Sequence, residues 1–201
     1  MKENDNYTRE LLTFDLIKAN LYGLFSIIPI LIIYLIPYYF IWQDSINKKN
    51  LKDLLIYYKD NVYLNPFLVG FIVLIALTIG IILHELIHGI TWAKYTKNGF
   101  KSIRFGVLWK FLTPYCHCKE PLLVKHYIIG GIMPAIVLGL FPTLLSFITG
   151  NVFLLIFGIF FTMAAFGDFM IIFLLLRENK NSLVLDHPSE VGCYIYREHE
   201  V

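Results

Sequence analysis

Four long apolar stretches constrain the fold of this chain more than any other feature. They cover residues 21–42, 66–92, 127–149 and 151–176. A helix needs about 20 mainly apolar residues to cross a bilayer, so each stretch is long enough for one span. Hydrophobic residues make up 57% of the chain, whereas ordinary soluble domains contain about 45–50%. The sequence therefore predicts an all-α membrane protein in a lipid bilayer, a four-transmembrane-helix bundle that forms one domain over residues 1–201.

The distribution of basic residues predicts which side of the membrane the chain ends face. With four spans, both termini and the segment 94–126 share one side, which holds all but four of the 17 Lys and Arg residues. Cytosolic segments carry an excess of these residues. We therefore expect a multi-pass protein of the cell membrane with both termini in the cytoplasm. The net charge of +2 gives no electrostatic support for a nucleic-acid partner.

Only four ionisable side chains fall within the predicted spans. The second span contains His84, Glu85 and His88, and the fourth contains Asp168, whereas the first and third contain none. An ionisable residue at the bilayer centre costs roughly 2.5–3.5 kcal/mol on insertion scales, so such residues are functional candidates. These four residues are the first place to look for a site.

The spacing in the second span is typical of a metallopeptidase. His84 and His88 are four residues apart, so both imidazoles lie on one helix face, where they can bind zinc. Glu85 follows the first histidine, and it can take a proton from a zinc-bound water and pass it to the leaving amine. The pattern predicts a zinc metalloendopeptidase of the HExxH type. Its cofactor is Zn²⁺, and its substrate is a peptide or a membrane protein cut near the cytosolic face.

Asp168 is the candidate for the third ligand that a catalytic zinc requires. His84 lies eighteen residues from the start of its predicted span, and Asp168 lies seventeen from the start of its own. At about 1.5 Å per residue, both lie roughly 26 Å below the outer boundary of the membrane. The two helices run in the same direction, so we expect the side chains to meet. A carboxylate paired with a histidine or with a loop lysine is the alternative.

Further polar residues near the spans have simpler interpretations. The run Cys116-His117-Cys118 resembles half of a Cys/His metal site, but free thiols facing a reducing cytosol are the simpler reading. His126 lies just before the third span, where it could polarise a substrate carbonyl or face water.

The segment between the second and third spans contains a strand pattern. Ile103, Phe105 and Val107 alternate with other residues, and Thr113-Pro114 can turn the chain back. We predict a short β-hairpin there that captures substrate by strand addition. A segment that only covers the zinc site is the alternative. Residues 182–196 fit either a second strand pair or a plain tail.

Several motifs together resemble a known family. They are His84-Glu85-Leu86-Ile87-His88-Gly89, Gly130-Gly131-Ile132-Met133-Pro134, Gly167-Asp168, and Asp186-His187-Pro188 followed by Gly192. From about residue 68 to 196 the chain is similar to bacterial membrane proteins of the zincin peptidase family. It is also distantly similar to the site-2 proteases, which are intramembrane zinc metalloproteases. In those proteases Gly follows the ligand aspartate, whereas here Gly167 precedes Asp168. The resemblance implies His84, His88 and Asp168 as metal ligands and Glu85 as the catalytic acid/base.

Two other functions fit a buried metal site. A catalytically silent zinc-binding scaffold is the main alternative, but a structural site has no need of Glu85 and usually has four ligands. A metal transporter needs a polar path across the membrane. The outer halves of the second and fourth spans offer only Thr78 and Thr162 for one.

Overall fold

The computed structural model describes residues 7–48, 66–109, 113–187 and 192–198, and it is mostly helical. The helical elements are α1 (Leu16–Lys48), α3 (Pro66–Ala93), the short 3-10 helix η1 (Gly99–Ser102), α4 (Val124–Pro134), the π-helical segment η2 (Ala135–Leu140), α5 (Phe141–Thr149), α6 (Val152–Ala164) and α7 (Phe166–Leu175). The strands are β1 (Tyr7–Thr13), β2 (Ile103–Leu108), β3 (Thr113–Cys118), β4 (Leu122–Leu123), β5 (Leu183–Asp186) and β6 (Gly192–Glu198).

Three described helices are long and apolar enough to cross a membrane. They cover Leu21–Ser45 in α1, Gly70–Ala93 in α3, and Val124–Thr149 through α4, η2 and α5. The predicted fourth span is not one straight helix, because α6 and α7 meet at a bend of 46°. Ala165, between them, has a ψ of 5°, outside the helical range. The pair makes a fourth span only if the two bent halves are taken together.

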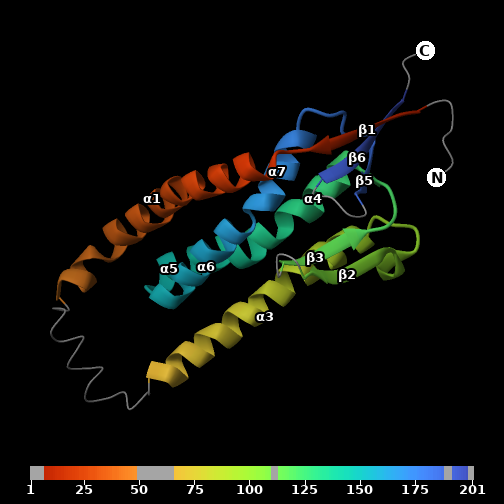
Figure 1. Ribbon diagram of the computed structural model, residues 1–201. Helices are drawn as coiled ribbons and strands as arrows, with labels where there is room; N and C mark the ends of the chain where they lie inside the picture. The colour runs from red at the N-terminus through yellow and green to blue at the C-terminus, as the bar shows by residue number, and fades with distance from the viewer. Residues whose placement is uncertain (1–6, 49–65, 110–112, 188–191, 199–201) are drawn as a thin grey trace.

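The helices α4 to α7 form a central layer with α1 and α3 on opposite sides of it (Figure 1). Side-chain hydrogen bonds from α1 reach this layer. The Tyr38 hydroxyl donates to the Gly150 carbonyl at 2.6 Å, and the Trp42 indole donates to the Phe147 carbonyl at 3.1 Å. A polar group in apolar surroundings is costly unless it is paired, so these bonds specify where α1 docks.

A tight turn makes α5 and α6 an antiparallel pair. Gly150 ends α5 in the left-handed region, with φ of 70°, which favours glycine. Asn151 then caps α6, because its side-chain oxygen accepts hydrogen bonds from the amides of Phe153 and Leu154.

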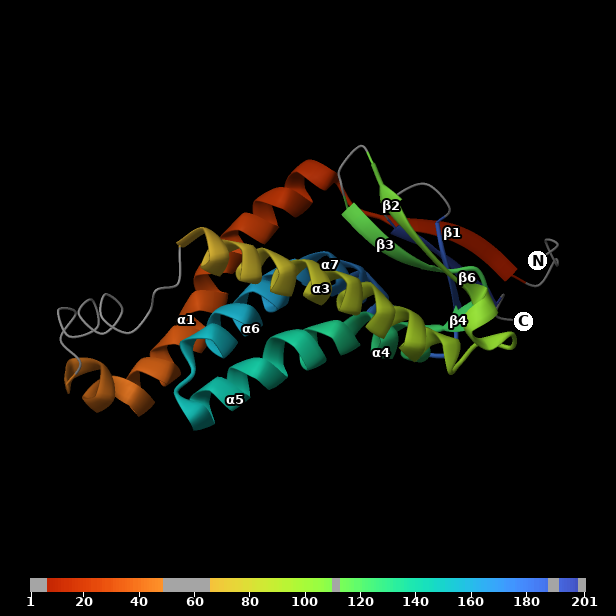
Figure 2. The ribbon, with the colours of Figure 1, turned by 90° about the horizontal axis from the view of Figure 1, so that it is seen from below.

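A four-stranded antiparallel sheet with strand order β1-β6-β5-β4 lies at one end of the helices (Figure 2). One face packs on the helices through Val184, Cys193 and Ile195, which are at most 1% exposed. The expectation of an all-α fold is therefore wrong at this end. Residues 182–196 do contain a strand pair, the first of the two readings offered for them.

The sheet brings both ends of the described chain together. β1 pairs with β6 along its whole length, and β4, which follows the second span and its loop, pairs with β5. The two ends and this loop thus share one end of the helices, as an even number of spans requires. The assignment of that end to the cytoplasm stays a prediction.

A second, two-stranded antiparallel sheet is formed by β2 and β3, between α3 and α4 in the chain. The expected turn at Thr113-Pro114 is wrong, because these residues begin β3 and pair with Leu108 and Val107. A proline is tolerated at the first residues of a strand that has few ladder bonds to lose. The connection, residues 110–112, lies outside the described residues.

Gly80 sets how closely α3 approaches the central layer. A Cβ at this position would lie 2.2 Å from the ring of Phe161, which is fully buried on α6. Gly80→Ala should therefore destabilise the protein by about 1–3 kcal/mol through overpacking. The thermal denaturation midpoint in detergent measures this. Gly70→Ala is the matched control, since no atom lies within 4 Å of its Cβ. It should be neutral or stabilising by up to about 1 kcal/mol, and equal losses in both variants would contradict the packing.

Candidate metal centre

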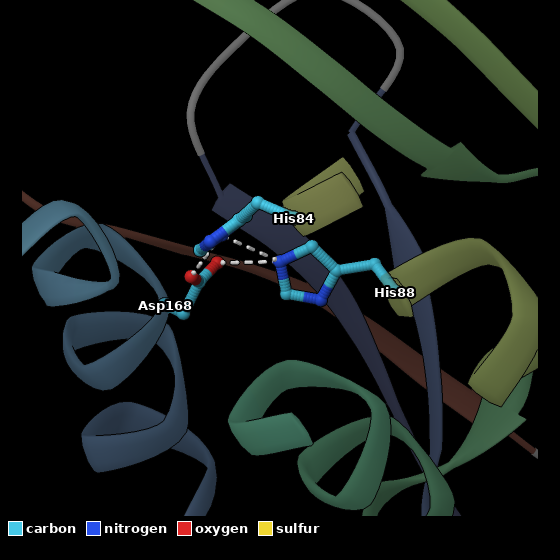
Figure 3. A group of neighbouring side chains, drawn as sticks. All are labelled: His84, His88 and Asp168. Carbon is cyan, nitrogen blue, oxygen red and sulfur yellow. Dashed lines mark hydrogen bonds and ion pairs between the residues drawn. The ribbon is translucent and has the colours of Figure 1, made fainter. Parts of the chain in front are cut away.

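Two histidines on successive turns of α3 and one aspartate on α7 converge at a single point (Figure 3). His84 and His88 are buried, at 7% and 3% exposed, on a helix whose other faces carry exposed apolar residues. Asp168 lies in the first turn of α7, directly after the bend. The depth argument predicted this convergence, and the structure confirms it. The role of the three residues as metal ligands stays a prediction.

The distances within the cluster fit a tetrahedral metal ion. The Nε2 atoms of His84 and His88 are 3.2 Å apart. Asp168 Oδ2 lies 3.1 Å from the first, and Asp168 Oδ1 lies 3.3 Å from the second. Zinc bonds of about 2.0–2.1 Å in a tetrahedron place neighbouring ligand atoms roughly 3.3 Å apart. Two imidazole nitrogens and one carboxylate form a donor set that zinc accepts, so the residues present fit this ion.

Pro134 supplies the acceptor that orients His88. An α-helix would join the Gly130 carbonyl to the amide of residue 134, but proline has no N–H to donate. The free carbonyl instead accepts a hydrogen bond from His88 Nδ1 at 2.8 Å. Because a carbonyl only accepts, Nδ1 carries the proton and the lone pair of Nε2 points at the cluster. The Gly-Gly-Ile-Met-Pro motif therefore has a physical role at the centre.

The indole of Trp92 packs against the same imidazole. Its indole stacks on His88 with ring centroids 5.0 Å apart, and its Nε1–H donates to the Tyr127 carbonyl at 3.1 Å. The indole fits only because residue 130 is glycine, since a Cβ there would lie 2.0 Å from Trp92 Nε1. The position of the His88 ring is thus fixed by packing as well as by its hydrogen bond.

Glu85, on α3 directly after His84, interacts with both the cluster and strand β3. Its carboxylate interacts with the backbone of Cys116 on β3 and with the charges of His84, His88 and Asp168. It is not part of the group of converging ligand atoms. The carboxylate is therefore close to the centre and free of it, which is the placement that a proton carrier needs.

A second buried carboxylate, Asp186 on β5, was missed by reasoning from the sequence about function. It accepts hydrogen bonds from the Tyr127 hydroxyl and, at 2.7 Å, from the Cys118 amide. His117 Nδ1 lies 3.8 Å from its Oδ2. Burial raises the pKa of the Asp186 carboxyl. The Asp-His-Pro motif was the available signal, and it marks a residue that ties the sheet to α4.

The remaining sequence candidates are not among the converging ligand residues. Cys116, Cys118 and Cys193 are free thiols, as expected for the first two. Burial raises the pKa of Cys118 to about 11 and that of Cys193 to about 12, so without a metal these thiols stay protonated at neutral pH. Within the described part of the chain, the run around His117 contributes nothing to a metal-binding group. His126 stacks on Tyr95 with ring centroids 4.0 Å apart.

Pro134→Ala tests whether the orientation of His88 matters for metal binding. The new amide N–H would compete for the Gly130 carbonyl, so His88 would lose its fixed orientation. Loss of such a supporting bond typically weakens metal affinity by about 10–100-fold, and titration of the apoprotein with zinc measures this. Pro29→Ala, at an exposed proline inside α1, is the control and should leave the affinity unchanged. Equal affinities in both variants would show that Pro134 has no such role.

Comparison with known proteins agrees with the geometry. The model of a family described as "putative zincin peptidase" matches residues 77–183, just over half of the 201 residues. A search of curated proteins and a search of solved structures found no match. The distant likeness to site-2 proteases stays a prediction. The matched range includes all three converging side chains and Glu85, and the chain belongs to the putative zincin peptidase family.

Proposed function

We propose that this protein is a membrane-embedded zinc metalloprotease that hydrolyses a peptide bond near the cytosolic face. One observation carries the proposal. Three ligand atoms from His84, His88 and Asp168 converge at distances that suit zinc, and the Glu85 carboxylate lies beside them without joining them. Family membership supports the same class of enzyme.

The chain's own residues would divide the work as follows. His84, His88 and Asp168 hold the ion, which when bound supplies a Lewis acid that makes water a stronger nucleophile at neutral pH. Glu85 accepts the proton that this water loses as it attacks the substrate carbonyl. The same carboxyl then delivers the proton to the nitrogen of the leaving amine. The contact with the Cys116 backbone keeps the Glu85 side chain on the hairpin side of the centre.

Access for substrate is proposed from the side of α7. The Asp168 side chain is 26% exposed, whereas those of His84 and His88 are 10% and 4% exposed. The ligand set is thus closed by protein around the histidines and open at the carboxylate. An open position is what separates catalytic zinc sites from structural ones.

The membrane placement is part of the proposal. The outward faces of α1 and α3 carry large exposed apolar side chains, such as Phe25 and Ile33 on α1 and Phe71 and Ile82 on α3. An exposed apolar surface of this extent suits lipid rather than water. His84 and His88 occupy the half of α3 nearer the sheets. With that end in the cytoplasm, the cut falls near the cytosolic face.

The β2–β3 hairpin is the proposed docking site for an extended substrate. Only two strands form this sheet, so each has an edge without a strand partner among the described residues. Phe105 on β2 packs against Gly89 of α3, one residue beyond His88. β3 in turn contacts Glu85 through Cys116. A substrate strand added to this sheet would run beside the centre and present its backbone to it.

Zinc quantification and cleavage assays on matched variants test the proposal. Glu85→Gln should keep zinc and lose essentially all cleavage, because the amide cannot carry the proton. Asp168→Ala should lose zinc and cleavage together. Full zinc in Asp168→Ala would remove the third ligand. Cleavage that survives in Glu85→Gln would favour the silent zinc-binding scaffold, with the activity coming from a contaminant.

Phe105→Pro tests strand addition separately from zinc binding. The proline removes one backbone N–H and disturbs the hairpin, so cleavage should fall strongly while zinc content stays at the wild-type level. Phe105→Ala is the control, since it removes the ring and keeps the backbone donor, and it should retain more activity. Unchanged cleavage in the proline variant would contradict the role of the hairpin and would favour a segment that only covers the site.

A further inference from the structure

A cavity of about 280 Å³ lies between the four-stranded sheet and the end of β3. It is separate from the three converging ligand atoms, and no residue of the proposed catalytic set lines it. The polar and aromatic side chains around it are Arg9, His117, Lys119, Asp186, Tyr194 and Tyr196, with Leu185 as the apolar part of the wall. Its size is just below the roughly 300–1,000 Å³ that is usual for small-molecule sites.

The sheet register explains why these side chains share one face. Arg9 pairs directly with Tyr196, and Leu185 pairs with Tyr194. Side chains two residues apart along a strand point to the same face, so all four project away from the core face that carries Cys193. The cavity is therefore built by the register of three strands.

Two basic side chains in the wall, Arg9 and Lys119, have no acidic partner within the described part of the chain. Arg9 lies over the ring of Tyr194 at 3.7 Å, and no ion pair is formed by Arg9 or Lys119 among the described residues. The nearby Arg197, by contrast, is paired with both Glu10 and Glu178. Acidic partners thus neutralise Arg197, the other arginine of this sheet, whereas Arg9 and Lys119 have no counter-charge among the described residues.

The single carboxylate in the wall does not fill that role. The oxygens of Asp186 accept hydrogen bonds from the Tyr127 hydroxyl and the Cys118 amide, both on the core side. On the cavity side, His117 Nδ1 lies 3.8 Å away. Asp186 is therefore held inward, and the imidazole of His117 adds another nitrogen to the basic wall.

We propose that this cavity binds a phosphate monoester. A dianion matches the two uncompensated cations, and arginine binds phosphate through paired, charge-assisted hydrogen bonds. The two tyrosine rings beside Arg9 supply flat apolar surface for the first atoms of an attached organic group. The volume admits a headgroup-sized ligand. The site does not depend on zinc or on the proposed cleavage.

Binding is tested on the full-length protein in detergent, with zinc content held constant. The probes are inorganic phosphate and glycerol 3-phosphate, with acetate at matched ionic strength for comparison. Calorimetric titration should show saturable binding of the phosphates and none of acetate. The double variant Arg9→Gln/Lys119→Gln should bind roughly tenfold more weakly or worse, because it loses both cations. Lys101→Gln, an exposed lysine outside the cavity wall, is the matched control and should bind as the wild type does.

A second experiment distinguishes a free phosphate ligand from the headgroup of a lipid. Nanodiscs of phosphatidylcholine with and without phosphatidic acid present the same monoester on a lipid. Binding of the soluble phosphates supports a free ligand, and a requirement for phosphatidic acid supports a lipid headgroup. The proposal is overturned if no probe binds saturably to the wild type. It is also overturned if the double variant binds as tightly as Lys101→Gln. Glu85→Gln should bind phosphate normally, so failure of the protease proposal would leave this result unaffected.

Discussion

The contact between α3 and α7 at the three-residue cluster is the interaction on which the rest of the structure depends. Polar groups buried among apolar helices are costly unless they are paired. The Nε2 atoms of His84 and His88 and the Asp168 carboxylate face one another at separations of 3.1–3.3 Å, whereas His84 Nδ1 is buried without a hydrogen-bond partner among the described residues. Two nearby features of the backbone help to bring these helices together. Gly80 lets α3 approach α6, and Ala165, at the bend before α7, comes three residues before Asp168.

The surroundings of the cluster show how a helical scaffold can fix an imidazole without further charged residues. A proline withholds one helix hydrogen bond, a glycine makes room for an indole, and the released carbonyl accepts a hydrogen bond from the histidine N–H. None of these groups adds a charge to an apolar environment. The Asp186 network does comparable work at the sheet, where it joins α4, β3 and β5. Strand β3 is linked to both sides, because the Cys116 backbone interacts with Glu85 beside the centre and the Cys118 amide donates to Asp186 on the sheet.

The convergence of the site could be predicted from the sequence because it depends on local rules. Helical spacing places His84 over His88, and a constant rise per residue places Asp168 at their depth. The four-stranded sheet could not be predicted in this way. Its first strand, Tyr7–Thr13, pairs with residues 179 to 191 positions away, and β4 has only two residues. Strand formation depends on such distant partners more than on local preference. The role of Pro134 in orienting His88 could not be predicted either, because the proline acts on a residue of another helix.

The identity and geometry of the metal centre are the central claim, and X-ray absorption at the zinc edge tests it most directly. The purified protein should show one zinc per chain with a first shell of nitrogen and oxygen only, at about 2.0–2.1 Å. Multiple scattering from two imidazoles should be present and should be lost when both histidines are replaced. A sulfur shell at about 2.3 Å would place the metal on the cysteines of β3 instead. That result, or an absence of bound zinc, would contradict the account.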